Sequence, residues 1–207
     1  MTILEIIEKK NRRLIDIPEQ FLSRVDKSQR EIFTELIAKL SQLERAGDKI
    51  LFTKKNLLLA DRINDELEQV LFSSDYLQAV KEFASEFDTQ KEINDKYFDK
   101  AFTDYQPSEL ADLVLQQTKK NAVELLAGST VKTGFLEPLK QQIDIIVSSG
   151  SSWRDAVQQL RDYAEGDGEV DGKLLRYSKQ IATDSLAISD RSYTSAVADD
   201  LESEWFL

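Results

Sequence analysis

The chain has 207 residues, of which 41% are hydrophobic and 31% charged, a composition that favours a soluble protein of one or two domains over membrane or low-complexity classes. It contains no Cys and no His, which excludes disulfide bonds, thiolate chemistry, the common zinc sites and imidazole acid–base catalysis. The net charge is −11: residues 1–60 carry 12 Lys/Arg against 9 Asp/Glu and the remainder 15 against 29, so duplex DNA is disfavoured as the main partner.

The first residues do not read as an export signal. Their apolar side chains are broken by two glutamates and precede a basic cluster, which reverses the order in a signal peptide. The cluster consists of Lys9, Lys10, Arg12 and Arg13. We interpret it as a solvated helix end, the alternative being contact with an acidic surface. No apolar run approaches the ~20 residues that span a bilayer, so we expect no membrane-spanning segment.

Helical spacing of apolar residues dominates the first half of the chain. One pattern begins at Pro18, which suits a first helical turn, and is expected to end near Gly47. Residues 49–52 could be extended, but this lone segment lacks a second strand to pair with. The next helical pattern is interrupted at Ser73 and Ser74, which predicts a kink or two successive helices.

The second half continues the helical periodicity. Pro107 biases its predecessor away from helix, and a new pattern runs from residue 108 to Gly128. A joint rich in Thr, Ser and Gly at residues 128–134 is the expected boundary between an N-terminal helical region (1–128) and a C-terminal helical region (129–207). Ser152, with Asp155 three residues later, resembles a capping box, and the last helix is expected from about Lys173 to Leu201.

These patterns predict an all-α fold. With only 7 Gly and 3 Pro in the chain, tight turns are scarce, so we expect an extended or open bundle of about seven or eight helices with little or no sheet. The sequence shows neither an internal repeat of fixed period nor sustained heptads, which disfavours a long isolated coiled coil.

An acidic loop at residues 165–172 is the most evident candidate for a metal site. Asp167, Glu169 and Asp171 match positions one, three and five of an EF-hand loop, and Gly172 matches the sixth. Position twelve, which needs a bidentate carboxylate, is Ser178. The loop is therefore interpreted as a solvated acidic turn.

Catalytic constellations are weak throughout. Adjacent carboxylates such as Asp199 and Asp200 would point about 100° apart on a helix, and no phosphate-binding loop motif occurs. Serines lack a His to activate them, although a Ser–Lys dyad is compatible with the composition. We expect no enzymatic activity, no cofactor and no metal, with a carboxylate- and metal-dependent enzyme as the remaining alternative.

The aromatic residues fall into two groups. Those near residue 100 (Tyr97, Phe98, Phe102 and Tyr105) are expected in the core, the alternative being a groove for a partner. Trp205, Phe206 and Leu207 have little local sequence to cover them. They either dock back onto the protein, are covered by a partner, or precede further residues of a longer natural protein.

The segment 153–207 resembles part of the tailed-phage minor head, or head-morphogenesis, protein family related to the F protein of phage Mu. The resemblance lies in the order of Trp153-Arg154-Asp155, Leu160-Arg161-Asp162-Tyr163, a Gly-bearing loop, Leu175-Arg176-Tyr177-Ser178-Lys179-Gln180-Ile181-Ala182-Thr183-Asp184-Ser185, Asp190-Arg191-Ser192-Tyr193, and Ala198-Asp199-Asp200-Leu201 leading to Glu204-Trp205-Phe206. It covers about the last quarter of the chain and only the helical part of the family. The mixed domain that usually follows in the family, with its Asp, Arg and Cys residues, has no counterpart in the chain up to Leu207.

The resemblance implies a virion structural or assembly role. Family members sit in the phage head in few copies, near the portal vertex, and some enter the host with the genome. The expected function is therefore a minor head protein, made in the host cytoplasm, that contacts the portal or inner capsid. The residues expected to contact other proteins are Arg176, Tyr177, Arg191, Tyr193, Trp205, Phe206 and Leu207. A self-associating helical adaptor or scaffold without enzymatic activity is the alternative.

Overall fold

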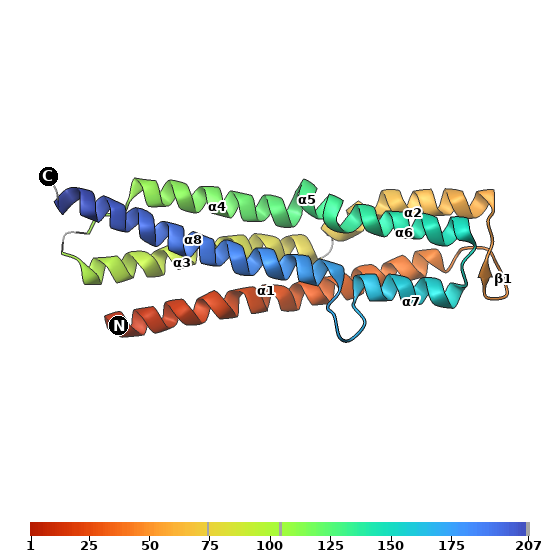
Figure 1. The fold of residues 1–207 in the computed structure, drawn as a ribbon, viewed down its shortest axis with the longest axis horizontal. Coiled ribbons are helices and arrows are strands. Elements are labelled where there is room, and N and C mark those ends of the chain that lie inside the picture. Colours follow the sequence, from red (N-terminus) through yellow and green to blue (C-terminus); the bar gives the residue numbers. More distant parts are fainter. Residues whose placement is uncertain (74, 104, 206–207) are drawn as a thin grey trace. The chain divides into compact units, whose positions relative to one another are not determined.

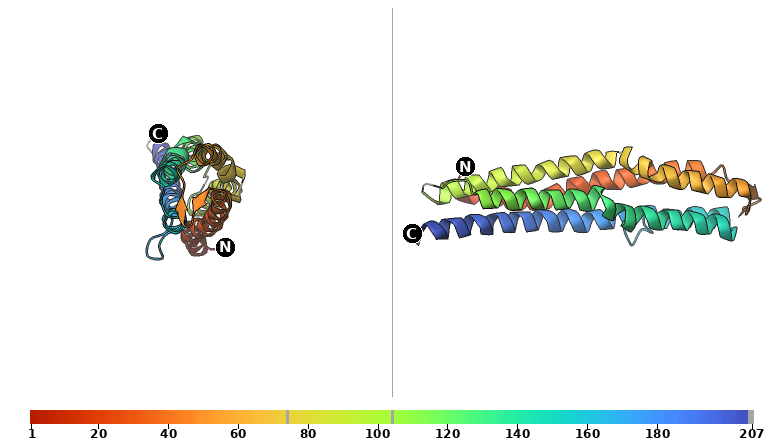
Figure 2. Two further views of the ribbon diagram at one scale, coloured as in Figure 1. Left: turned by 90° about the vertical axis from the view of Figure 1, so that its right-hand side faces the viewer. Right: turned by 90° about the horizontal axis from the view of Figure 1, so that it is seen from above.

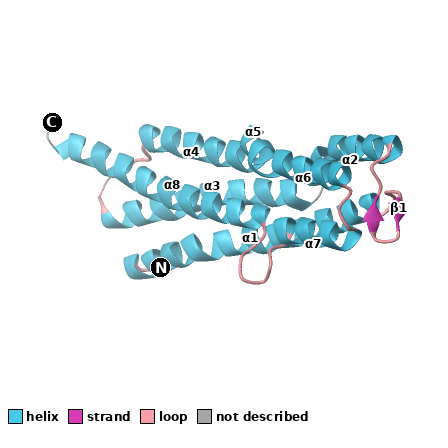
Figure 3. Ribbon diagram, turned by 45° about the vertical axis from the view of Figure 1, so that its right-hand side comes forward, coloured by secondary structure: helices cyan, strands magenta, loops and turns pink. Residues whose placement is uncertain are grey.

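A computed structural model describes residues 1–73, 75–103 and 105–205, without the side chains of residues 73 and 202–205. The protein is 83% helical, and Figure 3 shows a single small pair of strands among the described residues. The expected all-α class is thereby confirmed.

Eight α-helices and one π-helical turn follow one another along the described chain. They are α1 (Ile3–Leu40), α2 (Lys54–Ser73), α3 (Asp75–Ala101), α4 (Glu109–Ala127), α5 (Ser129–Val131), the π-helical turn η1 (Lys132–Leu136), α6 (Glu137–Ser149), α7 (Trp153–Ala164) and α8 (Lys173–Trp205). Counted as joined helices, the described chain has five, fewer than the seven or eight expected. At residues 129–136 the helices join because Val131, Phe135 and Leu136 are buried there.

Helix α1 begins fifteen residues before the proline that was expected to start it, since Pro18 lies inside the helix. A proline in a helix interior removes one hydrogen bond and costs about 3 kcal/mol. The buried apolar stripe continues on both sides of it, with Ile6, Ile17 and Phe21 each at most 6% exposed. Burial of this stripe offsets the local cost, so the prediction of a helix start at Pro18 is wrong.

The short strands form one hairpin. β1 (Arg45–Ala46) pairs antiparallel with β2 (Lys49–Ile50), so the segment expected to be extended and unpartnered finds its partner only two residues upstream. Gly47 has a φ of +64°, the left-handed conformation that tight hairpin turns require. This residue therefore turns the hairpin instead of ending a helix as expected, because α1 already ends at Leu40.

In the joint expected at residues 128–134, Gly128 is extended, but residues 129–134 are helical. α5 and η1 occupy it, and the buried side chains of Val131, Phe135 and Leu136 explain why: each is at most 1% exposed. The Ser152 cap is as predicted, since its hydroxyl accepts a hydrogen bond from the Asp155 amide at 3.1 Å.

The chain forms two compact units. Unit 1 comprises residues 1–21, 80–126 and 179–207, and unit 2 comprises residues 22–79 and 127–178. The colours in Figure 1 allow both to be followed along the sequence. Each unit contains segments from both sides of the boundary expected at residues 128 and 129. The division into an N-terminal region 1–128 and a C-terminal region 129–207 stays a prediction, and it does not coincide with these units.

Each unit surrounds its own apolar core. In unit 1 the segments come from α1, α3, α4 and α8, and Phe83 stacks on Phe21 with ring centroids 4.9 Å apart. In unit 2, α2 packs against α6, which Figure 2 also shows, and α6 packs against α7. The unit 2 core includes Ile32, Leu36, Leu40, Ile63, Leu67, Leu71, Leu139, Ile143, Ile146 and Leu160.

Candidate functional site

The residues expected to contact other proteins are spread over α8. Arg176 and Tyr177 belong to unit 2 and Arg191 and Tyr193 to unit 1, so the structure does not bring them together in one unit. Arg176 and Arg191 are exposed and Tyr177 is half-buried. Trp205 is the last residue of α8, but its side chain, like Phe206 and Leu207, lies outside what the structure describes.

Tyr193 lies in the core of unit 1 and not on an exposed surface. Its side chain is 1% exposed, and its hydroxyl donates a hydrogen bond to Asp95 Oδ1 at 2.5 Å. Tyr105 donates to the same oxygen at 2.8 Å, while Lys91 Nζ lies 2.8 Å from Asp95 Oδ2. These contacts join α8, α3 and the segment that follows α3. Tyr193 therefore stabilises the interior of unit 1 and is not exposed for contact with another protein.

The charge on Asp95 is maintained by these donors. Burial by itself would raise the pKa of Asp95, but hydrogen bonds from Lys91, Tyr193 and Tyr105 outweigh it and hold the pKa below its usual value. Burial, together with the nearby carboxylate, raises the pKa of both tyrosines. Asp95 is therefore ionised, and both tyrosine hydroxyls remain protonated and donate hydrogen bonds to it.

A second polar cluster is centred on Asp190 of α8. Its Oδ1 accepts from Lys10 Nζ at 3.0 Å, Gln90 Nε2 at 3.2 Å and Asn94 Nδ2 at 3.0 Å. Gln90 and Asn94 are at most 2% exposed, and their amide oxygens have no hydrogen-bond partner among the described residues. Sequence reasoning missed this cluster. Its signal is the pair Gln90 and Asn94, four residues apart, which interrupts the apolar stripe of α3.

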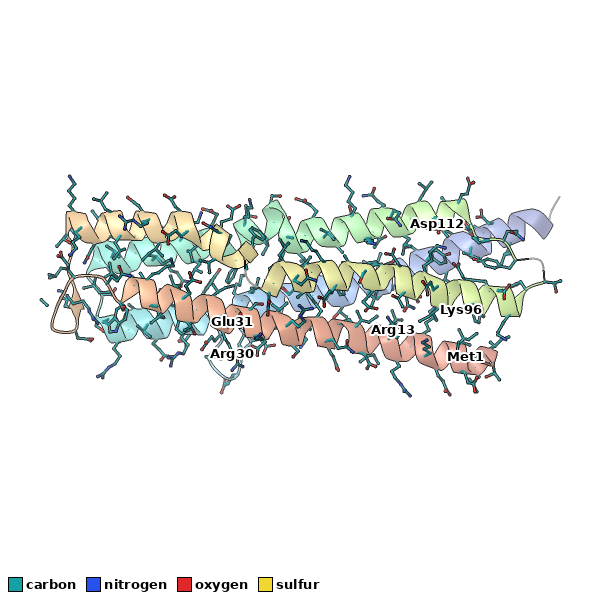
Figure 4. All side chains as sticks on the ribbon, turned by 180° about the vertical axis from the view of Figure 1, so that it is seen from behind. Met1, Arg13, Arg30, Glu31, Lys96 and Asp112 are labelled. Atoms are coloured by element: carbon teal, nitrogen blue, oxygen red, sulfur yellow. The ribbon has the colours of Figure 1, made fainter. Side chains whose placement is uncertain are left out.

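The basic cluster near the start of the chain is only partly solvated. Lys10 binds Asp190, and Arg13 forms an ion pair with Glu86 of α3. Figure 4 labels Arg13 on α1. Lys9 and Arg12 are exposed. The interpretation as a solvated helix end therefore fails for Lys10 and Arg13, because they neutralise carboxylates of unit 1.

The acidic loop is held by its own backbone. Asp167 Oδ1 accepts from the amides of Glu169 at 3.0 Å and Val170 at 2.8 Å, and these bonds lower the pKa of Asp167. Residues 167–171 are exposed. Within the described part of the chain, no group of three or more acidic side chains could hold a metal ion.

Tyr163 contacts the π-helical turn in unit 2. Its ring stacks on Phe135 with centroids 5.7 Å apart, and its hydroxyl donates to the Phe135 carbonyl at 2.8 Å. Burial raises the pKa of Tyr163 to about 12. A π-helical turn disturbs the regular helical bonding, and the tyrosine satisfies one of its carbonyls.

Large apolar side chains are exposed near the start of α1. Met1, Ile3, Leu4 and Ile7 are 55%, 40%, 65% and 36% exposed, respectively. Single exposed apolar residues are normal on protein surfaces, whereas here four occur among seven consecutive residues, and the spacing of Ile3, Leu4 and Ile7 puts these three on one side of α1. We call these four residues the α1 patch.

A second exposed surface lies at the start of α2 in unit 2. A groove of about 480 Å³ is lined by Gln42, Lys54, Lys55, Leu58, Leu59 and Arg62. Nearby in sequence, Phe52 is 65% exposed, and Leu58 in the groove is 55% exposed. We call this the α2 groove.

Comparison with known proteins yields no relatives: no family model, curated protein or solved structure matches the chain. Among the described helices, none is both long and apolar enough to cross a membrane. The function of the α1 patch and the α2 groove is therefore inferred from the residues that form them.

Proposed function

We propose that this protein is a minor head protein of a tailed phage, which works by binding the portal or the inner capsid and has no enzymatic activity. The resemblance of segment 153–207 to the head-morphogenesis family supports the phage assignment. The α1 patch supports a function through protein contact, and it is the observation on which the proposal mainly rests.

The α1 patch has the chemistry of a protein-binding surface. Burying one exposed leucine or isoleucine side chain is worth roughly 1.5–3 kcal/mol. Leu4, at 65% exposure, leaves most of this energy available to a partner. The charged residues Glu5, Glu8 and Lys9 surround the patch and would form a polar rim around an apolar centre.

Co-sedimentation with portal rings tests the proposal. The portal protein encoded nearest to this chain's gene is purified as rings, and the full chain is added at low and moderate salt. We expect the affinity for the rings to weaken by roughly a hundredfold in Ile3→Glu/Leu4→Glu. Two apolar contacts of about 1.4 kcal/mol each are lost, and each 1.4 kcal/mol is a factor of ten in affinity.

Ile145→Glu is the matched control. Ile145 is 58% exposed on α6 of unit 2, so this variant changes an equally exposed apolar side chain away from the patch. Failure of the wild-type chain to co-sediment at either salt concentration, or equal loss in both variants, would contradict the proposal.

A metal titration addresses the enzymatic alternative. A ligand that binds only the folded state must raise the melting temperature. We expect no rise in melting temperature with Mg²⁺, Mn²⁺ or Ca²⁺. A clear rise with any of them would favour a carboxylate-based metal site instead.

A further inference from the structure

The α2 groove combines positive charge with exposed apolar surface. Lys54, Leu58 and Arg62 follow one another at intervals of four residues, so they lie along one face of α2. Lys55 forms an ion pair with Glu44 at 2.9 Å, but Lys54 and Arg62 have no acidic partner among the described residues. The groove therefore offers two uncompensated cations beside exposed leucine side chains.

The helix adds to this positive potential. α2 has no acidic residue in its first turn, where the helix dipole is positive and carboxylates are normally favoured. Lys54 and Lys55 occupy that turn instead. A ligand that carried carboxylates next to large apolar side chains would neutralise these charges and cover Leu58 and Phe52.

The chain itself contains such a segment. Residues 199–207 hold four carboxylates, no Lys or Arg, and the four large apolar residues Leu201, Trp205, Phe206 and Leu207. Asp200 is bonded to Ser108 within unit 1, whereas Asp199 is exposed. By sequence, Glu202 and Glu204 add two more negative charges to the segment. Both the charge and the apolar character of this segment are complementary to the groove.

We propose that the α2 groove binds the acidic, aromatic segment 199–207 of a second copy of this chain. The contact joins unit 2 of one copy to α8 of the next, a heterologous interface that continues from copy to copy and forms either closed rings or filaments. This inference goes beyond the proposed function, since it concerns self-association and does not require a portal.

Analytical ultracentrifugation of the full chain over a range of concentrations is the first test. The wild type is expected to associate, and Lys54→Glu/Arg62→Glu to weaken association at least tenfold at low salt. High salt should weaken the wild-type contact too, because exposed charges are screened within about 10 Å at 0.1 M. The control Lys81→Glu/Lys96→Glu makes the same charge change at exposed lysines of unit 1 that lie outside the α1 patch, and it should associate like the wild type.

A mixing experiment identifies the occupant. The groove variant Lys54→Glu/Arg62→Glu and the segment variant Asp199→Lys/Glu202→Lys/Glu204→Lys should each associate poorly alone. Mixed in equal amounts they should associate again, because the reversed groove of one meets the reversed segment of the other. Circular dichroism of each variant at 222 nm establishes that it is folded before mixing.

Several outcomes would overturn the inference. These are a wild type that stays monomeric, a control that loses association as the groove variant does, or a mixture that fails to associate. A monomeric wild type that binds vesicles of anionic phospholipid through Lys54 and Arg62 would likewise overturn it, and would assign the groove to a membrane surface.

Discussion

Replacing Asp190 by alanine should destabilise unit 1 more than any exposed substitution. The change removes the oxygen that accepts from Lys10, Gln90 and Asn94, and leaves three donors in a region where Asp190 itself is 8% exposed. Breaking a buried ion pair by removing one partner costs about 3–5 kcal/mol. Because the side chain of Lys10 is 18% exposed and can partly reach water, we expect the lower end, about 3 kcal/mol.

Amide hydrogen exchange measures the loss of stability separately for peptides of unit 1 and unit 2. At about 1.4 kcal/mol per factor of ten, peptides from residues 84–101 should lose roughly a hundredfold in protection if they exchange by opening of unit 1. Asp144→Ala is the matched control: Asp144 is exposed and accepts one hydrogen bond from Asn64 at 2.8 Å, so its loss should cost about 1 kcal/mol or less. Equal effects of the two alanine substitutions would refute the reasoning.

Replacing the whole Asp190 cluster by apolar residues distinguishes two causes of instability. One is the cost of burying donors without an acceptor, and the other is the loss of the attraction between Lys10 and Asp190. Lys10→Met/Gln90→Leu/Asn94→Leu/Asp190→Leu removes the donors together with the acceptor, and such replacements are often neutral or stabilising. We expect this variant to be more resistant to urea than Asp190→Ala, as followed by circular dichroism. If it is equally unstable, the cost of Asp190→Ala does not arise from unpaired donors.

Three further predictions concern the remaining features. The pKa of Asp95 is lower in the folded protein than its ordinary 3.8, so the ionised form stabilises the fold above that value, and this stability is lost as the pH falls through the folded pKa. Urea unfolding should therefore show that Asp95→Asn destabilises the protein at pH 7 and has hardly any effect below the folded pKa. Tyr163→Phe should cost about 1 kcal/mol through the lost hydrogen bond and abolish the phenol that titrates near pH 12 in a spectrophotometric titration, whereas Tyr97→Phe should leave stability unchanged. Gly166 and Gly168 have similar φ values of +92° and +95°, but a Cβ at Gly166 would lie 2.1 Å from the Val170 carbonyl oxygen and one at Gly168 meets nothing within 4 Å. Gly168→Ala should cost about 1–3 kcal/mol from the backbone alone, and Gly166→Ala clearly more; equal melting temperatures would contradict the packing argument.

The sequence alone determined the helical class and much of the chain's local order. Apolar residues at three and four spacing, few glycines and few prolines predict helices wherever local propensity and burial agree. The Ser152 cap and the acidic loop follow the same logic, since they depend on residues within a few positions of each other. Helix α2 ends at Ser73 and α3 begins at Asp75, while Ser74, at the expected break, lies outside the described residues.

Tertiary packing decided the features that depend on distant residues. Pro18 and the joint at residues 128–134 are locally unfavourable for helix, yet buried side chains on both sides of them keep the chain helical. The Asp190 cluster was not predicted because Lys10 and Asp190 are 180 positions apart in the sequence, and local sequence patterns do not pair residues so distant. Helical periodicity specifies which face of a segment is apolar, whereas only the packed structure specifies which polar groups meet inside it and which apolar groups, as in the α1 patch, remain exposed.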